Sequence, residues 1–186
     1  MTFIESETIE LKSSVVADLC KEVIAFANTK GGTLYIGVED NGTVIGVDSA
    51  DRVTLQINNM VRDSIKPDIT MFVHYETQVI DDKQIIAVTV QEGTDRPYYL
   101  GSKGLKPSGV YVRNGTSTDP ASDTAIRKMI KETDGDSFET MRSLEQNLSF
   151  QAAEAQFAKR KVPYDAAKMQ SLGMVSSDGI YSNVAL

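Results

Sequence analysis

Two side chains near the start of the sequence, Glu10 and Lys12, are spaced so that they could do chemistry together. If residues 8–12 form a strand, alternate side chains share one face, so the carboxylate and the ammonium project side by side. Metal-dependent nucleases use such a pair, in which the carboxylate holds a divalent cation and the lysine stabilises developing charge. The same spacing also fits an ion pair on a half-exposed strand.

Further carboxylates could complete a metal site around this pair. Hard divalent cations need several oxygen ligands, and Glu5, Glu7, Glu39 and Asp40 are candidates. The alternative is that these acids are solvated groups of turns and strand edges. We therefore expect no cofactor, with Mg²⁺ or Mn²⁺ required only if the chain is a nuclease.

Residues 28–32, Asn-Thr-Lys-Gly-Gly, are a candidate for binding an anion. Backbone N–H groups of such a turn can surround a phosphate, and Lys30 adds positive charge. The preceding helix ends here, however, and the partial charge at its C-terminus repels anions. A helix cap is the favoured interpretation. Because the sequence has neither a P-loop nor a Gly-x-Gly-x-x-Gly motif, it gives no support for nucleotide hydrolysis.

Basic side chains interleaved with tyrosines form a candidate for nucleic acid. Such a mixture can hold phosphates and stack unpaired bases. The tyrosines are Tyr98, Tyr99 and Tyr111, and the expected binding residues are Lys30, Lys103, Lys106, Arg113, Asn114 and Thr116. Tyrosines are also ordinary strand residues, and loop lysines are ordinarily solvated.

The elements that must position these residues follow from hydrophobic periodicity and from turn signals. We expect strands near residues 8–12, 33–38, 43–47, 69–77, 84–91 and 110–113, and helices near residues 15–28, 48–66 and 121–131. This order predicts an α/β or α+β fold, with a mixed sheet of about six strands and three or four packed helices.

Three blocks of the sequence resemble the Schlafen/AlbA-type DNA-binding domain: residues 5–12, 26–47 and 106–118. The resemblance covers about residues 3–131. In bacteria this domain commonly opens proteins named as transcriptional regulators. The resemblance therefore implies nucleic-acid binding, with DNA favoured over RNA, in the N-terminal part of a bacterial regulator.

The same resemblance implies an alternative activity. Nucleolytic Schlafen proteins use two glutamates five residues apart, which Glu5 and Glu10 match, and a later acid, which either Glu39 or Asp40 matches. Lys12 would assist such a divalent-metal-dependent endonuclease. Those proteins carry an additional stretch between the second and third acids, which this chain lacks, and they build their RNA cleft from a duplicated domain.

Charge and composition limit how nucleic acid could be bound. The chain has 186 residues and a net charge of −7, and residues 1–131 carry 14 basic and 18 acidic side chains. Because Lys and Arg drive binding to a polyanion, the binding surface must be a local patch, or must come from a partner or from a further domain. A single cysteine, Cys20, favours a reducing cytoplasm. No apolar run is long enough for a membrane span.

The polar segment near residue 133 predicts a domain boundary. We expect a DNA-binding domain at residues 1–131, then a linker and a small helical appendage at residues 132–186, with helices near 150–161 and 163–172. The appendage is expected to begin a further domain of a longer protein. A third class of function, an assembly or ligand-sensing module that forms a homodimer through an exposed sheet edge, stays open.

Overall fold

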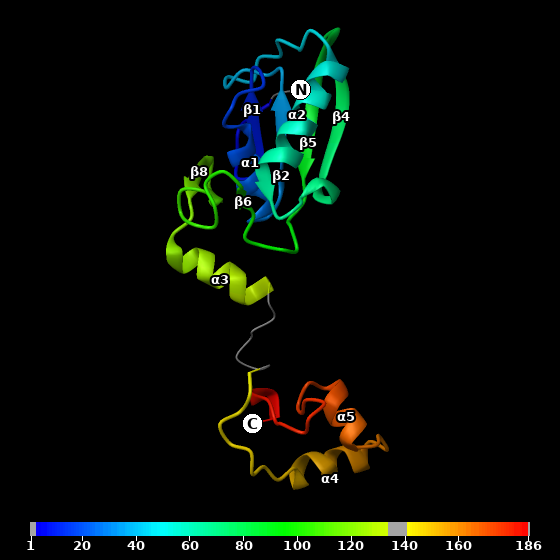
Figure 1. Ribbon diagram of the computed structural model, residues 1–186. Helices are drawn as coiled ribbons and strands as arrows, with labels where there is room; N and C mark the ends of the chain where they lie inside the picture. The colour runs from blue at the N-terminus through cyan, green and yellow to red at the C-terminus, as the bar shows by residue number, and fades with distance from the viewer. Residues whose placement is uncertain (1–2, 134–140, 186) are drawn as a thin grey trace. The chain divides into compact units, whose positions relative to one another are not determined.

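The computed structural model describes residues 3–133 and 141–185 (Figure 1). The chain divides into two compact units, residues 1–130 and 131–186. Helices and strands are mixed in an α+β arrangement, which confirms the expected fold class. No helix of the described residues is long and apolar enough to cross a membrane.

A four-stranded mixed sheet is the centre of the first unit. Its order is β1-β2-β5-β4, with β1 parallel to β2 and the other pairs antiparallel. The bounds are β1 Ile9–Lys12, β2 Gly32–Ile36, β4 Val73–Ile80 and β5 Lys83–Val90. The short 3₁₀ turn η1, Thr70–Phe72, precedes β4.

Two helices cover one face of this sheet. Helix α1, Leu19–Ala27, connects the parallel pair, and helix α2, Ala50–Ser64, follows β2. Their apolar faces form one core with β2 and β5, in which Ile24, Ile57 and Val88 are fully buried. The opposite face carries a smaller cluster built on Phe3, Leu11, Val38 and Ile85.

Two short ladders and a third helix complete the first unit. Strand β3, Ile65–Lys66, pairs with β6, Tyr99–Leu100. Strand β7, Tyr111–Asn114, pairs with β8, Ser117–Pro120. Helix α3, Asp123–Thr133, packs Ile126 and Met129 against Val110 and Ala121.

The strands are divided differently from the single six-stranded sheet that the sequence predicted. The expected strand at residues 43–47 is reduced to one bridge between Val38 and Val44. The backbone turns at Gly37 and Gly46, whose φ angles of 97° and 81° are unsuited to a strand. Near Pro120, the expected helix start belongs instead to β8, and α3 begins at Asp123.

The second unit is small and helical. It contains α4, Gln151–Lys159, α5, Ala166–Ser171, and a 3₁₀ turn η2, Asn183–Ala185. Both α-helices lack buried residues. The rings of Phe150 and Tyr181 lie tilted to each other, with centroids 5.4 Å apart. That this unit begins a further domain stays a prediction.

Candidate nucleic-acid interface

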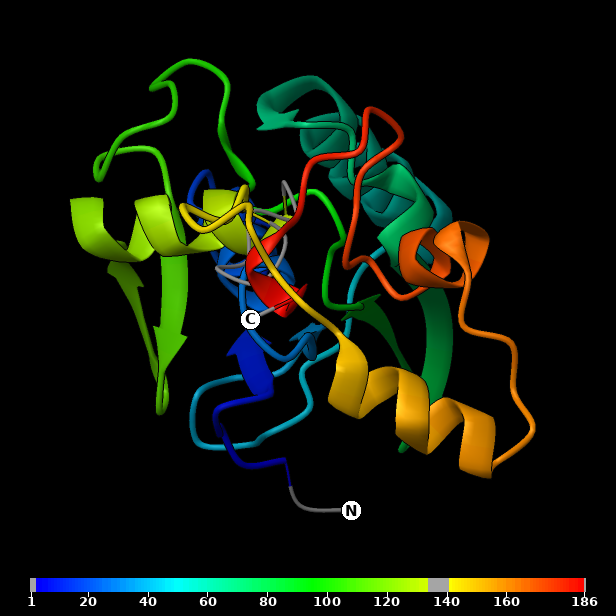
Figure 2. The ribbon, with the colours of Figure 1, turned by 90° about the horizontal axis from the view of Figure 1, so that it is seen from below.

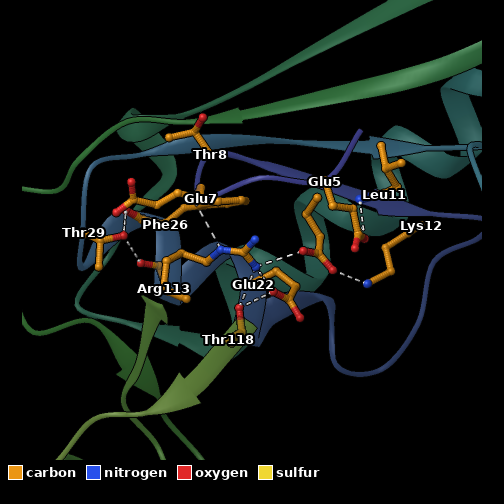
Figure 3. Close-up of polar contacts among 12 residues, drawn as sticks. Glu5, Glu7, Thr8, Leu11, Lys12, Glu22, Phe26, Thr29, Arg113 and Thr118 are labelled. Atoms are coloured by element: carbon orange, nitrogen blue, oxygen red, sulfur yellow. Dashed lines mark hydrogen bonds and ion pairs between the residues drawn. The ribbon is translucent and has the colours of Figure 1, made fainter. Parts of the chain in front are cut away.

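A buried ion network joins the β7–β8 hairpin to the central sheet and α1 (Figure 3). The Arg113 guanidinium is 0% exposed. Its Nη1 donates to Glu10 Oε2 at 2.9 Å, to Glu22 Oε2 at 3.2 Å and to Thr118 Oγ1 at 3.0 Å. Its Nη2 donates to the Ser6 carbonyl at 2.8 Å. All of the partners are protein groups.

This placement changes the role expected for Arg113. The guanidinium carbon lies 4.9 Å from the centre of the Phe26 ring, which encloses it further. A phosphate cannot reach a side chain that is completely covered. Arg113 therefore holds the hairpin onto the sheet and does not present its charge to a nucleic acid.

Glu10 and Lys12 lie side by side, as their spacing predicted, and they form an ion pair. Glu10 Oε1 accepts from Lys12 while its Oε2 accepts from Arg113. Burial lowers the pKa of Lys12, but the hydrogen bond from Lys12 to Glu10 and the nearby carboxylates outweigh burial and raise it. A divalent cation at Glu10 would have to displace these cationic partners.

Glu22 also belongs to the network, although it was not among the residues selected from the sequence. Burial raises the pKa of its carboxyl group, while the hydrogen bond from Thr118 and the charges of Lys12 and Arg113 oppose that shift. Its one signal in the sequence is that Lys21 and Glu22 are the charged residues of the otherwise apolar α1 segment. A helix position alone does not reveal a partner about 90 residues away.

The other predicted acids are distributed around the end of the sheet. Glu5 Oε1 accepts from the Leu11 N–H at 3.4 Å. Glu39 and Asp40 line an open pocket with Ser13 and Asn41. Within residues 3–133 and 141–185, no group of three or more His, Cys, Asp or Glu side chains is arranged to hold a metal ion. Metal binding and endonuclease activity stay predictions.

The Asn-Thr-Lys-Gly-Gly turn caps α1 and binds groups of the protein itself. The Asn28 Nδ2 donates to the carbonyls of Tyr98 and Tyr111 at 2.9 Å each, and its Oδ1 accepts from the Tyr98 N–H at 2.7 Å. Lys30 pairs with Glu7 at 3.1 Å. The turn is therefore occupied by internal contacts that join α1 to β6 and β7.

The tyrosines contribute to packing. Tyr98 is 0% exposed and Tyr111 is 9% exposed. The Tyr111 hydroxyl donates to the Ser108 carbonyl at 3.0 Å. Tyr99 is half-buried against the cluster around Val110. Stacking of unpaired bases on the two buried rings would require the core to open.

Lys103 and Lys106 remain as the cationic surface of this region. Both lie in the 101–109 loop between β6 and β7, both are exposed, and neither has an acidic partner among the described residues. Lys66 lies beside the loop, since its Cγ is 3.4 Å from the position that a Cβ on Gly101 would take. Lys66 was not predicted from the sequence, because the β3–β6 pairing that brings it here joins distant segments.

Asn114 and Thr116 are exposed, but they occupy the turn at the other end of β7. Figure 2 shows the green 101–109 loop at one end of the β7–β8 pair and the turn that connects the two strands at the other end. The expected binding residues therefore do not form one patch. Lys103 and Lys106 lie at one end of β7, and the polar turn lies at the other.

The family profile described as "Schlafen, AlbA_2" matches residues 5–122. The chain therefore belongs to the Schlafen AlbA_2 family, which confirms the resemblance seen in the sequence. No curated protein matches the chain.

One solved structure shows a related fold. The DIP2311 protein from Corynebacterium diphtheriae is 17% identical with a TM-score of 0.52, and the match covers 95% of this chain and 34% of that one. The chain thus spans about a third of that protein's length. The N-terminal domain of a RecG-related protein from Nitrosomonas europaea is 29% identical with a TM-score of 0.47, and that match covers 61% and 82% of the two chains.

Proposed function

We propose that this chain is the nucleic-acid-binding part of a bacterial transcriptional regulator, that it acts in the cytoplasm, and that its polymer is DNA. The observation that carries the proposal is a pair of exposed lysines, Lys103 and Lys106, within the span that matches the Schlafen AlbA_2 family. Neither lysine has an acidic partner in the part of the chain that the structure describes. Lys66 adds a third cation beside them.

The net charge of −7 determines how such binding should behave. The net charge repels a polyanion, so attraction must come from a few local phosphate contacts. The isolated chain should therefore bind weakly, and added salt should weaken the complex steeply. Asn114 and Thr116, at the far end of β7, are proposed as secondary donors to the backbone of the nucleic acid.

A titration of labelled oligonucleotides tests this proposal. Duplex DNA, single-stranded DNA and RNA are titrated with protein at several salt concentrations, and binding is followed by fluorescence anisotropy. We expect saturable binding with a preference for DNA, and substantial loss in the double variant Lys103→Gln/Lys106→Gln. No binding up to millimolar protein at low salt would contradict the proposal.

The matched control removes two charges elsewhere. Arg52 and Lys83 are both exposed, and Arg52 lies in the first turn of α2, far along the helix from the loop. The Arg52→Gln/Lys83→Gln variant should bind almost as the native chain does.

Two further measurements test the alternatives. Incubating the oligonucleotide with protein and Mg²⁺ or Mn²⁺, and checking whether it stays intact, separates binding from endonuclease activity. Light scattering tests whether the chain forms a homodimer.

A further inference from the structure

The 101–109 loop presents an apolar side chain between two cations. Leu105 is 47% exposed, and in the sequence it stands between Lys103 and Lys106, which are also exposed. A single exposed leucine is ordinary on a protein surface. This one is distinguished by its flanking charges in a chain whose net charge is negative.

The loop is held in this conformation by its own backbone. The N–H groups of Lys103 and Gly104 both donate to the Leu100 carbonyl at 2.9 Å, and the Gly109 N–H donates to the Lys106 carbonyl at 2.8 Å. Gly104 has a φ of 79°, and a Cβ on Gly109 would lie 2.2 Å from the Gly104 carbonyl oxygen. A loop closed in this way has little conformational entropy to lose on binding.

We propose that Leu105 acts as a wedge that enters between neighbouring base pairs of duplex DNA while Lys103 and Lys106 neutralise phosphates beside it. Apolar wedges partly unstack a base step and kink the duplex, and flanking cations offset the cost by holding the backbone. This inference rests on the proposed function and specifies its mode of contact.

The same loop fits a membrane surface poorly. One leucine buries too little apolar area to hold a protein on a bilayer. Vesicles that contain anionic lipid are therefore an arm of the test, and no binding to them is expected.

The experiment uses the full chain and a duplex that carries the fluorescent base analogue aminopurine. Unstacking of the analogue raises its emission, so the native chain should increase it on binding. The variant Leu105→Ala should abolish the increase and weaken binding roughly tenfold, through the lost apolar contact, while the salt dependence stays unchanged. Leu55→Ala removes a leucine that is 60% exposed on α2 and should change neither property.

The outcomes distinguish the two proposals. If the native chain binds DNA with the expected salt dependence but emission does not rise, or Leu105→Ala behaves as the native chain, the wedge is wrong and DNA binding stands. If the native chain binds no DNA, both proposals fail. Vesicle binding that depends on Leu105 would also overturn the wedge.

Discussion

Arg113 was expected from the sequence to bind nucleic acid, whereas the structure places it in a buried ion network. Its charge is enclosed by Glu10 and Glu22, and its exposure is 0%. A buried charge is tolerated only when it is paired. Each charged residue of the network should therefore contribute to stability, and substituting one residue at a time measures its effect on the free energy of unfolding.

Replacing Arg113 with alanine should destabilise the first unit by about 3–5 kcal/mol, because the buried carboxylate of Glu10 and the half-buried one of Glu22 both lose the guanidinium. The free energy of unfolding is measured by chemical denaturation at neutral pH. The control is Arg62→Ala, which removes an exposed pair with Asp63 and should have no measurable effect. A loss for Arg113→Ala as small as that of the control would show that the network is not structural.

The titration of Glu22 gives a second prediction. Burial raises its pKa above the ordinary value of 4.5, so the folded state holds the proton more tightly than the unfolded state does. Its contribution to stability is therefore present below pH 4.5 and is lost as the pH rises through the folded-state pKa.

The variant Glu22→Gln cannot titrate and should lack this contribution. Unfolding free energies of the native chain and the variant are compared from about pH 4 to pH 8. The difference, native minus variant, should decline as the pH rises through the folded-state pKa of Glu22. A difference that grows with pH would mean that the carboxylate is stabilised by Arg113 more than it is destabilised by burial.

At the scale of elements, Asn28 connects the end of α1 to β6 and β7 through three hydrogen bonds. The residue is 4% exposed. Removing its amide would take a partner from buried backbone groups of Tyr98 and Tyr111. Buried groups that lose a partner cost more than the bond itself contributes.

Asn28→Ala should therefore lower the free energy of unfolding by about 3 kcal/mol. The control is Asn59→Ala, in the interior of α2, where alanine is the better helix former and stability should stay the same or rise slightly. Hydrogen exchange gives a second readout, since the amide of Tyr98 should lose protection in the Asn28 variant. Unchanged exchange at Tyr98 would contradict the connecting role.

The sequence predicts the local elements well and their association less well. Periodicity and turn residues locate β1, α1, α2 and the β4–β5 hairpin because each signal lies within one segment. Pairing between Lys66 and Tyr99 depends on residues more than 30 positions apart, which no local pattern contains. The buried state of Arg113 has the same origin, since its partners come from two other elements.

The candidate site shows the same limit. Side-by-side placement of Glu10 and Lys12 follows from strand alternation and is confirmed. Exposure of Lys103 and Lys106 follows from a loop rich in glycine. Asn114 and Thr116 were grouped with those lysines in the sequence interpretation, although the strand expected near residues 110–113 lies between the two pairs and separates them in the structure.

At the scale of the whole molecule, an acidic chain is expected to bind a polyanion through a small cationic loop. Each phosphate contact contributes one unit to the salt dependence of binding, approximately, so the number of contacts can be measured without knowing the target sequence. The charge of the remaining surface affects the overall affinity, whereas the salt dependence counts the contacts.

The most direct test is the slope of log binding constant against log salt concentration for duplex DNA. Replacing both Lys103 and Lys106 with glutamine should reduce the magnitude of that slope by about two, while Arg52→Gln/Lys83→Gln should leave it nearly unchanged. Equal slopes for the native chain and the Lys103/Lys106 variant would contradict the central claim that the 101–109 loop contacts the phosphates.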